Sequence, residues 1–108
     1  MYDYNARITR VIDGDTFDVE VDAGFRIWYR SPLRLFGVNA PELRTPEGPI
    51  TRNAVLAWLG PLPATVRVHT HAPSALDKYG RYLAEVYKND ESLAAYLLAN
   101  HLAVEYLL

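Results

Sequence analysis

Apolar and polar residues alternate along much of the first half of the chain, which is typical of β-strands with one buried face. In "TFDVEVD" (16–22), a phenylalanine and two valines alternate with acidic residues, so we predict a strand here. The preceding "ARITRVI" (6–12) predicts a weaker strand. Asp13 and Gly14 lie between the two strands, and this pair predicts a tight hairpin in which both residues adopt positive φ.

A third strand segment is predicted from two apolar stretches on either side of a proline. Both "FRIWYR" (25–30) and "LRLFGV" (33–38) are rich in strand-forming residues. Because proline cannot donate a hydrogen bond to a neighbouring strand, we expect the segment to be broken at Ser31-Pro32.

A helix is predicted after the loop "NAPELRTPEG" (39–48). Pro49 suits a first helical position, and Gly60-Pro61 is expected to end the helix. The apolar face is predicted to consist of Ile50, Ala54, Ala57 and Trp58.

The second half of the chain predicts two more strands and a second helix. The strands are "ATVRVHT" (64–70) and "RYLAEVY" (81–87), and the helix is "DESLAAYLLANHLA" (90–103), with acidic residues at its N-terminus. Five short strands with a helix between the third and fourth match the element order of an OB-type barrel. We therefore predict one mainly β, α+β domain over residues 1–108: a five-stranded OB-fold-type barrel with about two capping α-helices.

The composition is that of an ordinary globular protein, with 50% hydrophobic and 22% charged residues. A formal net charge of −2 argues against a protein that coats nucleic acid through a basic surface. The N-terminus lacks the pattern of a secretory signal, so we expect an intracellular, cytoplasmic protein with no membrane partner. We expect a monomer. Because the chain contains no cysteine, disulfides and thiolate metal sites are excluded.

Two opposite charges lie close to an apolar run in "LRLFGVNAPE" (33–42). The alternation directs Leu33 and Leu35 to one face of the strand and Arg34 to the other. One interpretation is a surface arginine and an exposed loop carboxylate at Glu42. The other is that the rigid Asn-Ala-Pro-Glu segment holds Glu42 on the arginine's side of the barrel.

The segments "DGDT" (13–16) and "DKYGR" (77–81) also permit two interpretations each. The first is either a plain hairpin turn or the source of Asp15, whose carboxylate would join Asn39 and the Ala40 carbonyl in an oxygen-only cluster suited to Ca²⁺. The second is a turn that places Arg81 at a strand end. The adjacent Lys78 and Tyr79 are either solvated turn residues or hold a phosphate and stack on a base.

The stretch "RIWYR" (26–30) interleaves arginines with aromatic residues. It is interpreted either as an outward-facing strand with charges that discourage aggregation, or as side chains that stack on bases beside phosphate contacts.

Together, "VIDGDT" (11–16), "LRLFGVNAPE" (33–42) and "DKYGR" (77–81), in this order and at these separations, resemble the staphylococcal nuclease family. The resemblance extends to "EGPITRNAVLAWL" (47–59) as the first helix and "LAAYLLANHLAVEY" (93–106) as the second. It implies an OB barrel and a Ca²⁺-dependent nuclease, with Mg²⁺ or Mn²⁺ as alternative cations. Such an enzyme cuts DNA and RNA with little sequence preference and leaves 3′-phosphate and 5′-hydroxyl ends.

The resemblance also implies a role for individual residues. Arg34 and Arg81 resemble the arginines that bind the scissile phosphate, and Glu42 resembles the general base. Asp15 resembles the first metal aspartate, and Ala40 would contribute its backbone carbonyl. Asn39 stands where a second aspartate is usual, so metal binding is expected to be weaker. The alternative is therefore a catalytically weak or inactive OB-fold module that binds nucleic acid.

Overall fold

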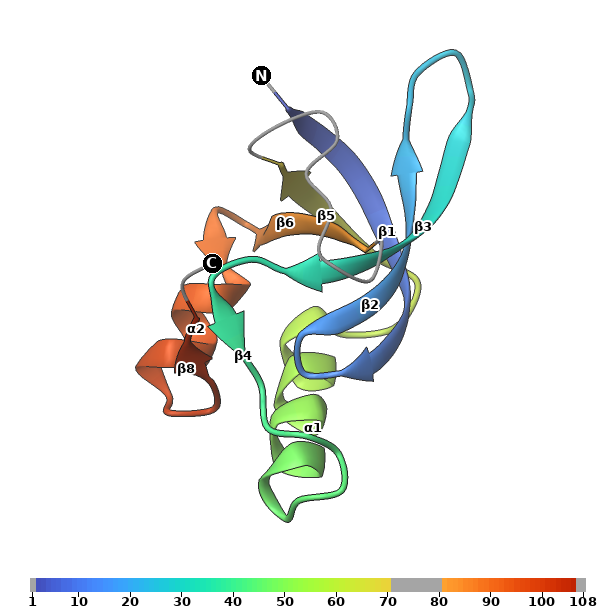
Figure 1. Ribbon diagram of the computed structural model, residues 1–108. Coiled ribbons are helices and arrows are strands. Elements are labelled where there is room, and N and C mark those ends of the chain that lie inside the picture. The colour runs from blue at the N-terminus through green and yellow to red at the C-terminus, as the bar shows by residue number, and fades with distance from the viewer. Residues whose placement is uncertain (1, 71–80, 107–108) are drawn as a thin grey trace.

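Five strands close into a barrel in the computed structural model, which describes residues 2–70 and 81–106 (Figure 1). The barrel strands are β1 (Asp3–Asp13), β2 (Thr16–Asp22), β3 (Trp28–Leu35), β5 (Ala64–His69) and β6 (Tyr82–Lys88). β1 pairs antiparallel with β2 and β5, β2 with β3, and β5 with β6. A short parallel pairing of β3 with β6, from Leu33 to Leu35, closes the barrel. This is the predicted OB-type arrangement.

Within the described residues, two helices and three short strands complete the fold (Figure 1). These elements are β4 (Val38–Asn39), α1 (Glu47–Leu59), β7 (Glu91–Ser92), α2 (Leu93–Ala99) and β8 (Val104–Glu105). β4 pairs antiparallel with β8, so the chain after α2 is fixed beside the segment that follows β3. Neither described helix is long and apolar enough to cross a membrane.

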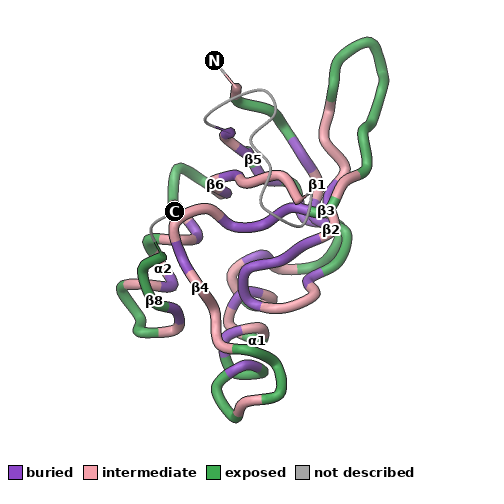
Figure 2. The backbone as a smooth tube through the Cα atoms, in the orientation of Figure 1, coloured by how far each residue is buried: buried purple, intermediate pink, exposed green. Residues whose placement is uncertain are grey.

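The core lies inside the barrel and between the barrel and the helices (Figure 2). Its largest fully buried side chains include Ile8, Phe17, Leu35, Leu59, Leu93 and Leu97. On β2 the apolar residues alternate inward as predicted, with Phe17 and Val19 buried. Burial of these side chains supplies the main driving force for closing the barrel.

The predicted apolar face of α1 is wrong in part. Ile50 is 60% exposed and Ala57 is exposed, whereas the buried stripe follows Thr51, Val55 and Leu59. Thr51 was not expected in this stripe because it is polar. Its hydroxyl donates a hydrogen bond to the Leu102 carbonyl at 2.6 Å, so burial leaves no unpaired group at this position.

The β1–β2 hairpin differs from the prediction at its turn. The turn residues are Gly14 and Asp15, and Gly14 does not adopt positive φ. Glycine is required here by space, because a Cβ atom would lie 2.6 Å from Thr51 Cγ2 and 2.8 Å from Ala40 Cβ. The turn is thus pressed against α1 and Ala40, which brings Asp15 into the interior.

The predicted break at Ser31-Pro32 is also wrong. β3 runs without interruption through Pro32, which is paired with Asp18 of β2. Among the described residues, the pairing of β3 with β6 begins only at Leu33, so no described strand requires a donor from Pro32 on the side away from β2. The strand begins at Trp28, and residues 23–27 form the hairpin loop.

α2 is shorter than predicted, because it ends at Ala99 and not near Ala103. Its N-terminus is capped by the Ser92 hydroxyl, which accepts a hydrogen bond from the Ala95 N–H at 3.2 Å. The acidic residue Glu91 lies in β7 and not in the first helical turn.

The close approach at Gly14 generates a stability prediction. We expect Gly14→Ala to destabilise the protein by about 1–3 kcal/mol in urea denaturation, since the added methyl group overfills the contact with Thr51. Thr51→Ser removes the clashing Cγ2 atom and keeps the hydroxyl, so the double variant should recover part of the loss. Equal stability of wild type and Gly14→Ala would contradict this account of the turn.

Candidate active site

Arg34 lies at the end of β3 and is buried, with 9% of the residue exposed. Its Nη1 donates to the Leu35 carbonyl at 2.7 Å and to the Val38 carbonyl at 2.8 Å. The interpretation of Arg34 as a surface arginine is therefore wrong. The chain turns back through Gly37, which has φ +91°, and this turn folds the two carbonyls around the guanidinium.

The second terminal nitrogen of Arg34 contacts two predicted site residues. Nη2 donates a hydrogen bond to Asn39 Oδ1 and lies 3.4 Å from Asp15 Oδ2. Both oxygens therefore lie on the same side of one guanidinium. Because Nη1 is held by backbone carbonyls, the orientation of the whole group is fixed by the fold.

The Asp15 carboxylate is held by hydrogen bonds from the backbone and a side chain. Oδ2 accepts from the Ala40 N–H at 2.7 Å, and Oδ1 accepts from the Thr16 hydroxyl at 3.1 Å. Burial raises the pKa of Asp15 from 3.8 to about 6, and the neighbouring Asp13 contributes to the increase. A nearby cation would stabilise the ionised form of Asp15, because the present contacts of this carboxylate compensate its negative charge only in part.

The predicted metal site consists of three residues, and the fold brings all of them together: Asp15, Asn39 and Ala40. The Asp15 carboxylate and the Asn39 amide oxygen both approach Arg34 Nη2, and oxygen donors of this kind are the ligands that hard divalent cations prefer. The described residues contain no group of three or more His, Cys, Asp or Glu side chains, so the formal charge of the donor set is low. Ala40 contacts Asp15 through its N–H, whereas the predicted ligand is its carbonyl.

Arg81 lies immediately before β6 and reaches across to the start of β2. Its Nη1 donates to the Thr16 hydroxyl at 3.3 Å, and that hydroxyl itself donates to Asp15. Thr16 is also the cross-strand partner of Arg34. Sequence reasoning missed Thr16, although its position directly after Asp15 in "DGDT" was an available signal.

Glu42 lies in the loop between β4 and α1, and its side chain is 66% exposed. In the described part of the chain its carboxylate pairs with Arg44 Nε at 2.5 Å. The loop is closed by Thr45, whose N–H and hydroxyl both donate to the Glu42 carbonyl. Arg44 was not anticipated from the sequence, although it lies only two residues after Glu42.

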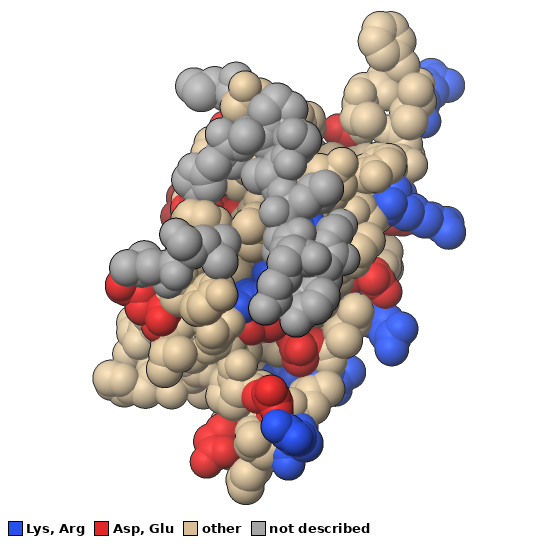
Figure 3. Space-filling view, in the orientation of Figure 1, with Lys and Arg blue, Asp and Glu red and all other residues tan. Residues whose placement is uncertain are grey.

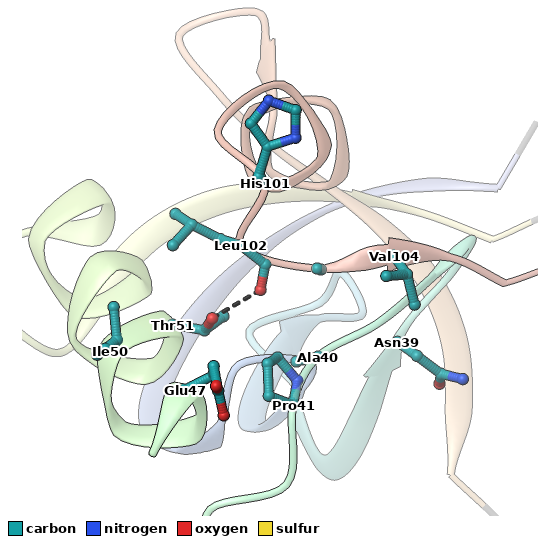
Figure 4. A pocket seen from close by; sticks show the side chains of 10 residues that line it. Asn39, Ala40, Pro41, Glu47, Ile50, Thr51, His101, Leu102 and Val104 are labelled. Atoms are coloured by element: carbon teal, nitrogen blue, oxygen red, sulfur yellow. Dashed lines mark hydrogen bonds between the residues drawn. The ribbon is translucent and has the colours of Figure 1, made fainter. Parts of the chain in front are cut away.

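A pocket of about 300 Å³ flanks this cluster between α1, β4 and β8 (Figure 4). Asn39, Ala40 and Pro41 line its β4 side, and Ile50 and Leu102 line the opposite side. The pocket is mainly apolar, and Asn39 and Ala40 connect it to the charged cluster. Lys78 and Tyr79, the predicted nucleic-acid contacts, lie outside the described residues.

The fold and the cluster define a class of protein: an OB-type barrel in which buried arginine and carboxylate side chains meet beside an open pocket. Comparison with protein families matches residues 32–107 to the family described as "Staphylococcal nuclease homologue". The chain belongs to this family. The matched segment includes Arg34, Asn39, Ala40 and Glu42, whereas Asp15 precedes it and joins them through the fold.

Two curated proteins of Oryza sativa subsp. japonica are similar to this chain. They are "Probable staphylococcal-like nuclease CAN3", 32% identical over 68 residues, and "Probable staphylococcal-like nuclease CAN2", 31% identical over 68 residues. Each match covers 63% of this chain and 17% of the relative. The chain therefore matches only a small part of the length of either relative.

The position of Thr16 between Asp15 and Arg81 generates a second prediction. We expect Thr16→Val to lower the free energy of unfolding by about 1 kcal/mol, because a buried carboxylate oxygen loses its donor. Thr9→Val is the matched control, since the Thr9 hydroxyl donates to the Asp18 carbonyl at an exposed position. Equal effects of the two variants in urea denaturation would show that Thr16 has no special role.

Proposed function

We propose that this chain is a metal-dependent nuclease that hydrolyses phosphodiester bonds of DNA and RNA with little sequence preference. The products would carry 3′-phosphate and 5′-hydroxyl ends, and Ca²⁺ is the proposed cation, with Mg²⁺ or Mn²⁺ as alternatives. The observation that carries the proposal is the buried Arg34 guanidinium, which is oriented by two backbone carbonyls beside Asp15 and Asn39. Family membership supports the same activity.

The two arginines would bind the scissile phosphate. Phosphodiester hydrolysis concentrates negative charge on the phosphate oxygens, so guanidinium groups that are already oriented stabilise the transition state more than the ground state. Arg34 is oriented by its backbone contacts and Arg81 by Thr16.

Asp15 and Asn39 would hold the cation through their side-chain oxygens, and Ala40 through its carbonyl. When bound, a divalent cation supplies neutralisation of phosphate charge and polarisation of a water molecule. Asp15 is kept in place for this role by the Ala40 N–H and the Thr16 hydroxyl.

Glu42 would accept the proton of the attacking water. An ordinary carboxylate can do this if it comes within hydrogen-bonding distance. Its ion pair with Arg44 is exposed, and such pairs contribute about 0–1 kcal/mol, so substrate binding can readily exchange that partner.

A second candidate function is a module that binds nucleic acid with weak or no turnover. Asn39 favours it, because an amide removes one negative charge from the cation site. To separate the two functions, purified protein is incubated with denatured DNA and with RNA while Ca²⁺, Mg²⁺ and Mn²⁺ are titrated against a chelator. Oligonucleotide binding without metal-dependent cleavage would exclude the enzyme.

Two substitutions test the proposed chemistry. Glu42→Gln should lower kcat about 10²–10⁴-fold and Arg81→Ala about 10²–10³-fold, because each removes a group that acts in the transition state. Glu42 is exposed, so the melting temperature of Glu42→Gln should remain that of the wild type. Arg44→Gln is the matched control and should retain turnover. Full activity in both site variants would show that the assigned roles are wrong.

Asn39→Asp tests the cation site. A second carboxylate beside Asp15 should tighten Ca²⁺ binding about tenfold or more and raise activity at low Ca²⁺. Calorimetric titration and the Ca²⁺-induced shift in melting temperature provide the measurements. Asn53→Asp, on the exposed side of α1, makes the same charge change away from the site. An unchanged metal dependence in Asn39→Asp would mean that Asn39 is not a ligand.

A further inference from the structure

The β2–β3 hairpin extends well beyond the barrel (Figure 1). β2 and β3 stay paired from Thr16↔Arg34 to Asp22↔Trp28, whereas the pairing of β3 with β6 begins only at Leu33. β2 is also paired with β1 as far as Val21, so the part of the hairpin that projects beyond the barrel is its tip with the adjoining ends of β2 and β3.

The hairpin tip, residues 23–27, is ordered by hydrogen bonds. The Ala23 N–H donates to the Ile27 carbonyl and the Ile27 N–H to the Gly24 carbonyl, both at 2.9 Å. The Gly24 N–H donates to Asp22 Oδ1 at 2.9 Å. The loop thus has a defined conformation although it makes few contacts with the barrel.

Two consecutive non-glycine residues at the tip adopt the left-handed conformation. Phe25 has φ 52° and Arg26 has φ 62°, which is unfavourable for side chains of this size. Phe25 is 98% exposed. The loop therefore holds an apolar ring in water at a cost in free energy, whereas an ordinary surface loop would place a small or polar residue there.

Trp28 offers a second aromatic surface at the base of the tip. The Arg7 guanidinium lies 3.8 Å from the centre of its ring, and Arg7 is in turn held by Glu20 at 3.1 Å. Trp28 nevertheless remains 41% exposed. The indole is thus fixed on one face by a cation–π contact and keeps accessible surface for a ligand.

Arginine side chains are interleaved with Phe25 and Trp28 along the hairpin. Arg26 is at the tip, and Arg30 lies two residues after Trp28, with 85% of its side chain exposed and Glu20 as its partner. Figure 3 shows basic side chains on the hairpin and along the edge below it. Arginine beside exposed aromatic rings is the combination that binds single-stranded nucleic acid, through phosphate contacts and base stacking.

The hairpin is connected to the candidate active site by one face of β3. Trp28, Arg30, Pro32 and Arg34 are alternate residues and lie on the same face. At about 3.3 Å per residue, Trp28 lies roughly 20 Å from Arg34 along the strand. A single strand bound at Arg34 therefore needs several nucleotides to reach the tip.

We propose that the outer β2–β3 hairpin is a second binding surface for single-stranded nucleic acid, on which bases stack against Phe25 and Trp28 while Arg26 and Arg30 contact phosphates. The inference rests on the proposed function, which supplies the strand bound at Arg34. Ile27 and Tyr29 are exposed on the hairpin as well, and the interleaving of these apolar side chains with Arg26 and Arg30 favours a ligand that carries both phosphates and flat rings over a lipid surface or a second copy of the chain.

Binding is measured first, without turnover, as the fluorescence anisotropy of a labelled 20-nucleotide single strand in excess chelator. Phe25→Ala and Arg26→Ala should each weaken binding about five- to tenfold, and Arg26→Ala should also reduce the dependence on salt. Phe25→Leu should behave like Phe25→Ala, since leucine is apolar but cannot stack. Arg67→Ala, a half-exposed arginine on β5, is the matched control and should bind like the wild type.

The fluorescence of Trp28 reports directly on contact between the hairpin and a bound single strand. The chain has two tryptophans, so Trp58→Phe leaves Trp28 as the sole indole. Its fluorescence should be quenched by the 20-nucleotide strand and not by a dinucleotide. Unchanged fluorescence at saturation would overturn the stacking part of the proposal.

Cleavage assays separate this surface from the active site. Phe25→Ala should raise KM for the 20-nucleotide strand and leave turnover of a dinucleotide unchanged, because a dinucleotide cannot span the distance. Binding without cleavage by the wild type would refute the proposed function and leave the hairpin surface standing. If Phe25→Ala and Arg26→Ala bind the strand like the wild type, the hairpin proposal is wrong. It is equally wrong if the hairpin variants instead lose binding to lipid vesicles or lose self-association.

Discussion

The candidate site depends on one buried positive charge, the guanidinium group of Arg34. A charge in this position must be compensated, and it is surrounded by the carbonyls of Leu35 and Val38 and by Asp15 and Asn39. These contacts join the end of β3, the turn after it and the β1–β2 hairpin. The same interactions that make the buried charge tolerable therefore assemble the side chains that would act on a phosphate.

The barrel itself could be predicted because its strands alternate clearly and its first helix ends at Gly60. The errors occur where tertiary contacts override local preferences. Pro32 continues a strand because no described strand pairs with it on the side away from β2, and Thr51 is buried because a distant carbonyl accepts its hydrogen bond. Neither the strand-edge position of Pro32 nor the hydrogen bond of Thr51 can be recognised from the local sequence pattern.

For the site, the sequence motifs identified residues that the fold brings together, although alternation alone suggested a surface position for Arg34. Its burial depends on the turn through Gly37, which folds carbonyls back over the side chain. The roles of Thr16 and Arg44 were missed although both residues neighbour predicted site residues, because each role depends on side-chain contacts across the fold or within an irregular loop.

The parallel pairing that closes the barrel covers only Leu33 to Leu35 on β3, and the two arginines lie beside this seam. Arg34 belongs to one of the joined strands, and Arg81 immediately precedes the other. A fluctuation that separates β3 from β6 would therefore move the two guanidinium groups apart while most of the antiparallel pairs remained intact. Under the proposed function, a phosphate bound by both arginines would in turn hold the barrel closed, because it would link β3 to the residue that precedes β6.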